Sequence, residues 1–138
     1  MAAWELFAHG ADVGVRGVGP TREAAFEQGA LALMQAMGAG EGVAARQRVT
    51  IACEAPDDEV LFVDWLNALI FEIATRGMLF ARFRVEIEDG RLRGGAWGEP
   101  LDPTRHEVAV EAKGATFTAL KVARQGDGTW VAQCVVDV

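Results

Sequence analysis

The sequence predicts a single α+β domain in which a mainly antiparallel β-sheet packs against two long helices. Two segments place apolar residues at the three- and four-residue spacing of a helix, and seven or eight shorter segments alternate like strands. The 138 residues contain no internal repeat, low-complexity tract or linker. A chain of this length buries roughly 68–70% of its unfolded surface on folding. We therefore expect one compact domain over residues 1–138.

The central helix is predicted over Asp57–Arg76. Asp57, Asp58 and Glu59 suit the positive end of a helix dipole, and Gly77 ends the helix. Acidic and amide residues interrupt its apolar run well before 18 residues, which excludes a membrane span. The apolar sector is wide, so we expect a sheet curled around the helix. The residues of this sector are Leu61, Phe62, Trp65, Leu66, Leu69, Ile70 and Ile73.

The remaining elements follow in a β-β-α-β-α-β-β-β-β-β order. A first helix is predicted from the N-cap Thr21 to Met37, with Gly38 as its stop. Asp89-Gly90 and Asp127-Gly128 are two-residue hairpin signals. The expected strands are Ala3–Ala8, Val13–Gly19, Gln47–Glu54, Arg82–Glu88, a strand from Leu92 onward, Val108–Glu111, Ala115–Arg124 and Thr129–Val138.

Composition limits the function classes. A net charge of −7 and a pI near 4.8 argue against strong direct binding of nucleic acid, although local basic patches remain possible. Cys53 and Cys134 lie in strand-like apolar runs and are interpreted as small buried hydrophobic residues, not as a disulfide or metal ligands. The first residues have neither the basic start nor the apolar run of a signal peptide, so we expect a soluble cytoplasmic protein without a membrane partner.

Two acidic positions far apart in the sequence are candidates for one site. His9-Gly10-Ala11-Asp12 breaks a strand pattern at a glycine, and Asp137 is the lone acid in the final apolar strand. The plainer interpretation of Asp12 is that it caps nearby backbone amides. The plainer interpretation of Asp137 is that it is a solvated charge. If the two segments meet, the carboxylates of Asp12, Asp137 and the Val138 main chain converge. Two carboxylates 4 Å apart repel each other by about 4 kcal/mol at an effective dielectric constant of about 20. Such oxygen ligands favour Mg²⁺, Mn²⁺ or Ca²⁺ over Zn²⁺.

Two further features carry polar side chains at breaks in strand patterns. Lys113 interrupts a strand just before Gly114, where a solvated lysine is the plainer interpretation. Glu99 lies in Trp97-Gly98-Glu99-Pro100, and His106 follows, where a histidine is more often structural than catalytic. The sequence contains no nucleophile elbow, phosphate loop, CxxC pair or HExxH helix.

Taken together, these features resemble the archease family over nearly the whole chain and in order. The motifs are an F-x-H-x-A-D turn, a W-L-N helix, a G-E-P-x-D loop with a following histidine, a K-x-x-T-[FY] strand and a W-x-A…D-hydrophobic end. In this sequence they comprise Phe7, His9, Ala11, Asp12, Trp65, Leu66, Asn67, Gly98, Glu99, Pro100, Asp102, His106, Lys113, Thr116, Phe117, Trp130, Ala132, Asp137 and Val138.

The resemblance implies a compact α+β protein that is not itself an enzyme. It implies an accessory protein that promotes guanylylation and multiple turnover of an RtcB-type RNA ligase in tRNA splicing or RNA repair. It also implies a divalent metal ion held by Asp12, Asp137 and the main-chain oxygen of Val138. Lys113 matches the functional lysine of the family, and His9 and Glu99 match polar positions beside the site.

Three residues depart from the family pattern. Gly10 replaces the usual threonine of the turn, Ala68 replaces a glutamate after W-L-N, and Thr118 replaces a histidine. The sequence is also compatible with two other functions: a small metal-dependent phosphoester hydrolase, and a protein-binding module whose acidic cluster is only structural. The sequence also leaves the metal, the RNA substrate and any weak homo-oligomer undetermined.

Overall fold

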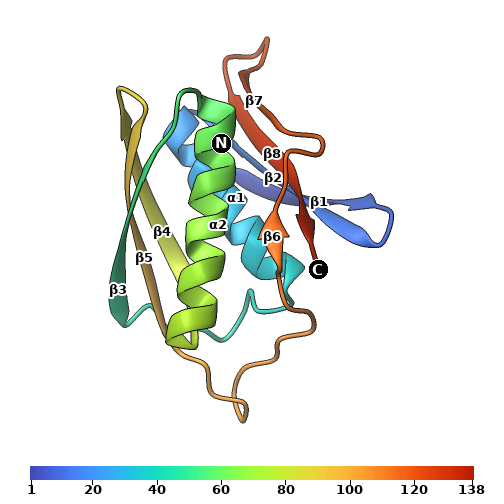
Figure 1. Ribbon diagram of the computed structural model, residues 1–138, viewed down its shortest axis with the longest axis vertical. Coiled ribbons are helices and arrows are strands. Elements are labelled where there is room, and N and C mark those ends of the chain that lie inside the picture. The colour runs from blue at the N-terminus through green and yellow to red at the C-terminus, as the bar shows by residue number, and fades with distance from the viewer.

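Two antiparallel sheets enclose the two helices in the computed structural model, which describes residues 1–138 (Figure 1). The two predicted helices and the predicted order of elements through β5 are confirmed, and the strand total of eight lies within the predicted seven or eight. The elements are β1 (Ala3–His9), β2 (Asp12–Gly19), α1 (Arg22–Ala36), β3 (Gln47–Glu54), α2 (Asp58–Arg76), β4 (Met78–Glu88), β5 (Arg91–Pro100), β6 (Gly114–Ala115), β7 (Lys121–Arg124) and β8 (Trp130–Asp137).

The strands form two separate sheets where the sequence suggested a single curled one. The five-stranded sheet has the order β1-β2-β8-β6, with β7 also paired to β8, and the three-stranded sheet has the order β3-β5-β4. Every pairing is antiparallel. The wide apolar sector of α2 explains why there are two sheets. Each sheet has one face turned toward the core, and the helix needs both of these faces to bury its apolar residues. The expected α+β fold class is confirmed.

The helix α2 begins and ends as its residues predict. The Asp57 side chain accepts a hydrogen bond from the Val60 amide at 2.9 Å, and Gly77 ends the helix in the left-handed region at φ 63°. Trp65 is fully buried and its indole N–H donates to the Phe26 carbonyl at 3.0 Å, which joins α2 to α1. Neither helix of the structure has the length and apolar character that a membrane crossing requires.

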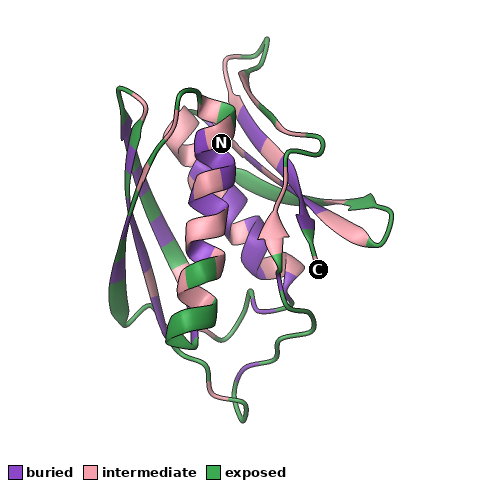
Figure 2. Cartoon of the chain, in the orientation of Figure 1, coloured by how far each residue is buried: buried purple, intermediate pink, exposed green.

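The helix α1 lies directly on β2. The Thr21 hydroxyl caps it by accepting a hydrogen bond from the Ala24 amide at 3.0 Å. Gly17 of β2 faces the helix backbone, and a Cβ there would clash with the Ala25 carbonyl oxygen. Buried residues lie on the helices and on the sheet faces turned toward them. The last turns of α2 are exposed (Figure 2).

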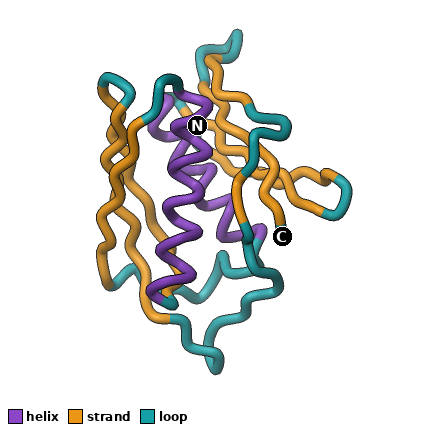
Figure 3. Tube along the Cα trace, viewed as in Figure 1, coloured by secondary structure: helices purple, strands orange, loops and turns teal.

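Two predicted strands are wrong. Val108–Glu111 belongs to the long loop between β5 and β6 (Figure 3), because its amides at Ala109 and Val110 donate to the Met37 carbonyl at the end of α1 instead of to a strand. Ala115–Arg124 is not one strand: the chain turns after Phe117, and Ala119 adopts a left-handed φ of 54°. The two parts are β6 and β7, and both pair with β8.

Cys53 and Cys134 are both free thiols; Cys134 is buried as expected, whereas Cys53 is only half-buried. Cys53 is on β3 and Cys134 is on β8, so the two lie in different sheets. Burial raises the pKa of Cys134 to about 12 and that of Cys53 to about 11. Both side chains therefore stay protonated at neutral pH and behave as small apolar groups.

Candidate functional site

The hairpin between β1 and β2 positions His9 and Asp12. These two residues are the last cross-strand pair, and Gly10 and Ala11 form the two-residue turn between them. Gly10 adopts φ 60°, a conformation that this kind of turn requires and that glycine takes without strain. His9, at the end of the edge strand β1, is exposed, and Asp12, at the start of the interior strand β2, is half-buried.

The final strand brings the end of the chain to this hairpin. The β2–β8 ladder ends at the pair Val13 and Val136, so Asp12 and Asp137 occupy the next position along the two strands. The Val138 amide donates a hydrogen bond to the Asp12 carboxylate at 3.2 Å. The segments that contain Asp12, Asp137 and Val138 therefore meet in the fold.

β6 places Lys113 on the other side of β8. Gly114 pairs with Asp137, and the Lys113 amide donates to the Asp137 carbonyl at 2.8 Å. The Lys113 side chain is exposed, and its main chain alone holds the contact with β8. His9, Asp12, Asp137 and Gly114 thus form one row across four neighbouring strands, with Lys113 beside it.

Asn67 of α2 fixes the short strand β6. Its side-chain oxygen accepts from the Ala115 amide at 2.8 Å, and its side-chain nitrogen donates to the Ala115 carbonyl at 3.3 Å. A two-residue strand has few ladder hydrogen bonds of its own, so this paired contact from the helix holds the chain that carries Lys113. The W-L-N motif includes Asn67 but does not predict this contact, since nothing local shows which strand a half-buried helix amide meets.

Phe7 supports the adjoining row of the same sheet. Its ring occupies the space above Gly14, where any Cβ would clash with the ring. The Arg16 guanidinium lies over the Phe7 ring at 4.7 Å from the centroid, and Arg16 is itself bound to Glu5 and Gln133. Gly14 of β2 therefore leaves room for the Phe7 ring on the outer face of the sheet, near the His9–Asp12 pair.

Glu99 lies in a different cluster from the other predicted site residues. It is 5% exposed and accepts hydrogen bonds from the Ala44 amide at 2.6 Å and from Arg105 at 2.7 Å. The His106 ring nitrogen Nε2 lies 3.1 Å from the same carboxylate. The Ala44 amide first, and then His106 and Arg105, hold the pKa of Glu99 below its ordinary value. Glu99 thus ties the 42–45 loop to the loop after β5, and its partners include none of Asp12, Lys113 or Asp137.

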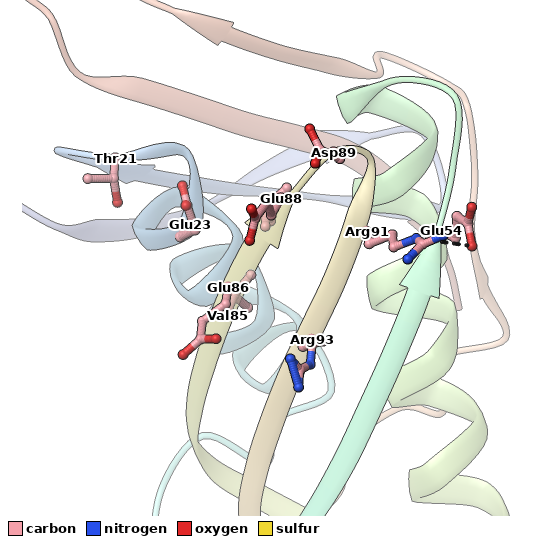
Figure 4. Close-up of a pocket in the computed structure, with 10 residues that line it drawn as sticks. Thr21, Glu23, Glu54, Val85, Glu86, Glu88, Asp89, Arg91 and Arg93 are labelled. Atoms are coloured by element: carbon pink, nitrogen blue, oxygen red, sulfur yellow. Dashed lines mark ion pairs between the residues drawn. The ribbon is translucent and has the colours of Figure 1, made fainter.

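A wide groove on the surface is also separate from the hairpin and the chain end. It is an open groove of about 770 Å³ beside the β4–β5 turn and the start of α1, lined by carboxylates with Arg91 and Arg93 (Figure 4). Glu54 and Arg91 form an ion pair at 3.8 Å on its rim. No residue of the His9–Asp12 turn or of β8 lines this groove.

The comparison with known proteins settles the family. The model of the Archease protein family matches residues 4–138. The chain belongs to the archease protein family. Its relatives include the protein archease of Pyrococcus furiosus, 39% identical over the full length of both chains. Another is the protein archease of Methanopyrus kandleri, 38% identical over 98% of this chain and 99% of the relative.

Solved structures show the same relationship. The solution structure of Methanobacterium thermoautotrophicum protein 1598 matches with a TM-score of 0.78 and 32% identity, covering 99% of each chain. A Thermotoga maritima archease, described as a possible chaperone, matches with a TM-score of 0.62 over 97% of this chain and 96% of that one. At 22% identity the second likeness shows the fold alone. These archease relatives are named as proteins or a possible chaperone, not as enzymes.

The donor atoms at the chain end of this archease suit a hard cation. The structure contains no group of three or more His, Cys, Asp or Glu side chains spaced to hold a metal ion. An ion here would therefore take two side-chain carboxylates at most, with main-chain oxygen atoms and water completing the shell. Asp12 uses one carboxylate oxygen for the Val138 amide and keeps its other lone pairs, and Asp137 is exposed. An all-oxygen set of this kind fits Ca²⁺, Mg²⁺ or Mn²⁺.

Proposed function

We propose that this member of the archease family activates an RtcB-type RNA ligase in the cytoplasm, promoting its guanylylation and repeated turnover in tRNA splicing or RNA repair. The observation that supports the proposal most is the meeting of the β1–β2 turn with the end of β8, in which the Val138 amide donates a hydrogen bond to the Asp12 carboxylate at 3.2 Å. Asp12, Asp137 and Lys113 lie on neighbouring segments at one end of the five-stranded sheet, and the exposed Asp137 and Lys113 make this end the surface that we assign to the partner.

The residues at this end of the sheet have separable roles in this proposal. Asp12, Asp137 and the main-chain oxygen of Val138 hold a divalent ion, which supplies positive charge beside the nucleotide-binding pocket of the partner. Lys113 presents an ammonium group to phosphate or to a partner carboxylate, since its side chain has no ion-pair partner within this chain. His9 is exposed at the end of the same row, where it can bind the partner. Glu99 acts at a distance by holding the 42–45 loop.

The proposal is tested by ligase guanylylation with the archease protein added in substoichiometric amounts. Wild-type protein is expected to raise the fraction of guanylylated ligase over many turnovers. Asp12→Asn and Asp137→Asn are expected to lose this stimulation, with divalent-ion affinity in calorimetry at least about tenfold weaker. Lys113→Gln is expected to lose stimulation while keeping the ion, because only its main chain contacts Asp137.

Matched controls separate these effects from a simple change of charge. Glu41→Gln removes an exposed carboxylate from a loop, and Lys121→Gln removes the other lysine of the chain, which is exposed on β7 of the same sheet. Both are expected to stimulate like wild type. Equal stimulation by the Asp12 and Asp137 variants would refute the metal-site mechanism. Turnover of nucleotides or phosphoesters without any ligase would instead make the protein a hydrolase.

A further inference from the structure

The outer face of the three-stranded sheet concentrates arginine in an otherwise acidic protein. The register of β3 and β4 on β5 sets Arg48 and Arg82 on either side of Trp97, in one row across the sheet. Arg84 flanks Gly95 in the next row, and Arg93 occupies the middle of the third. A bulge at Ala81 of β4 gives Arg82 its place opposite Trp97. All four arginines are exposed.

These arginines are short of acidic partners within the chain. No carboxylate oxygen lies within salt-bridge distance of Arg48, Arg82 or Arg93, and Arg84 has only Glu86 at 3.9 Å. Four guanidinium groups against one carboxylate give these three rows a formal charge of +3, whereas the whole chain carries −7. Unpaired charge of one sign on a small face is the electrostatic footprint of a polyanion site.

Trp97 lies among these charges as an aromatic platform. The guanidinium carbons of Arg82 and Arg48 are 4.3 Å and 5.4 Å from the centroid of its ring. The indole lies along the strand above Gly95, where an added Cβ would be 2.8 Å from the ring. Indole and guanidinium planes are the surfaces on which the bases of single strands stack.

A shallow groove runs over this face. Its volume is about 280 Å³, and it is lined by Arg48, Arg84 and Arg93, by one carboxylate, that of Glu86, and by Thr50, Gly94 and Gly95. Two residues in a strand advance about 7 Å and neighbouring strands are about 5 Å apart, so the four arginines cover roughly 10 by 14 Å. This area suits a chain of regularly spaced anions better than one compact anion.

We propose that this arginine face, defined by Arg48, Arg82, Arg84, Arg93 and Trp97, binds the phosphate backbone of single-stranded RNA. A docking surface for a protein has an apolar centre, and only Ile51 and Ala52 among the groove residues are apolar. Arginine offers phosphate a planar pair of donors, and the aromatic ring offers bases a stacking partner. The net charge of −7 opposes the interaction, which makes it weak and strongly dependent on salt.

The face ends where the charge pattern changes. The fourth row of the sheet is Glu54, Arg91 and Glu88, and there Arg91 lies 3.8 Å from Glu54. Figure 4 shows this end of the sheet, with Glu54, Glu88 and Asp89 around the two arginines of β5. Two carboxylates per guanidinium repel phosphate, so the RNA is confined to the rows that contain Trp97, Gly95 and Arg93.

The test is fluorescence anisotropy of a labelled 12-nucleotide single-stranded RNA, titrated with the protein alone between 20 and 200 mM KCl. Three or four phosphate contacts predict a slope of log K against log salt of about −2 to −3. The double variant Arg48→Gln/Arg82→Gln is expected to reduce that slope by about 1.4 and to weaken binding more than about tenfold at 50 mM salt. No ligase is present, so the result is independent of the proposed function.

A matched double variant guards against a general charge effect. Lys121→Gln/Arg124→Gln removes two exposed cations from β7 in the other sheet and is expected to change binding less than about twofold. Thermal melts of both double variants verify that the fold is intact. Absence of saturable binding at 20 mM KCl, or equal weakening by the two double variants, overturns the proposal. Displacement of the RNA by polyglutamate at equal charge, or by stoichiometric GTP or pyrophosphate, overturns it in favour of an acidic protein or a small anion.

Discussion

The Val138 amide donates its hydrogen bond to a carboxylate, that of Asp12, from which it is separated by 126 positions in the sequence. The contact exists because β2 and β8 are neighbours in the five-stranded sheet, with Val13 opposite Val136. A site made from two segments so far apart has no counterpart in the unfolded chain, since closing so long a loop costs conformational entropy that only the folded sheet offsets. A ligand that binds where Asp12 meets Val138 therefore binds the folded protein and stabilises it.

Two substitutions of Asp12 distinguish the effect of its negative charge from the effect of its hydrogen bond to the Val138 amide. Asp12→Asn keeps a side-chain oxygen that accepts from the Val138 amide, whereas Asp12→Ala removes both the acceptor and the charge. We expect the Val138 amide to exchange with solvent faster in Asp12→Ala and at nearly the wild-type rate in Asp12→Asn. Hydrogen exchange followed by NMR measures the rates. Equal exchange in all three proteins would show that the contact does not hold the chain end.

Asn67→Ala is expected to destabilise the protein by about 1–3 kcal/mol, because it leaves the amide and the carbonyl of Ala115 without their helix partner. Asn67→Asp retains the acceptor and loses the donor, so an intermediate loss is expected. Urea unfolding provides the free energies. Thr75→Ala on the same helix removes an exposed hydroxyl bonded to the Phe71 carbonyl and serves as the control, with a change within about 0.5 kcal/mol. A loss at Thr75 as large as that at Asn67 would contradict the assignment.

Most of the fold was predictable because its signals are local. Thr21 caps the first helix and Gly77 ends the second, as their positions indicated, whereas Asp57, predicted as the first residue of the second helix, is its N-cap. Strand alternation also predicted β4 and β8 to within a few residues. The segment at Val108–Glu111 alternates equally well, but its amides bind the end of α1. No local pattern distinguishes an extended segment that joins a sheet from one that binds a helix end.

The candidate site was only partly predictable for a related reason. His9 and Asp12 were placed on one turn from Gly10 alone, but the meeting of Asp12 with Asp137 is a matter of strand order, which the resemblance to archease supplied. Arg82 and Arg84 were expected on an exposed strand face. Their gathering with Arg48 around Trp97 depends on the cross-strand register and on the bulge at Ala81, which the sequence does not show.

Glu99 makes stability depend on pH in the acidic range. The hydrogen bond from the Ala44 amide, with those from His106 and Arg105, lowers the pKa of Glu99 below its ordinary value of 4.5. Since the folded pKa is the lower one, the stabilisation is fully present above pH 4.5 and is lost as the pH falls through the folded pKa. As the pH is lowered from 7 to 3, the melting temperature of Glu99→Gln is expected to fall less steeply than that of wild type. At pH 7 the variant is expected to be less stable than wild type. Glu41→Gln is the control and should reproduce the wild-type profile; a Glu99→Gln profile parallel to wild type would contradict the prediction.

Gly17→Ala tests how closely α1 approaches β2. A methyl group at this position would clash with the Ala25 carbonyl and with the Gly29 amide, which are both helix backbone atoms and cannot rotate away. The helix must then move off the sheet, and we expect a loss of about 3 kcal/mol or more and a Tm lower by roughly 10 °C. Gly126→Ala is the matched control, because its Cβ meets no atom within 4 Å and its φ is not left-handed. There we expect a change within about 0.5 kcal/mol. Similar melting temperatures for the two variants would mean that α1 does not rest on the backbone of β2 in solution.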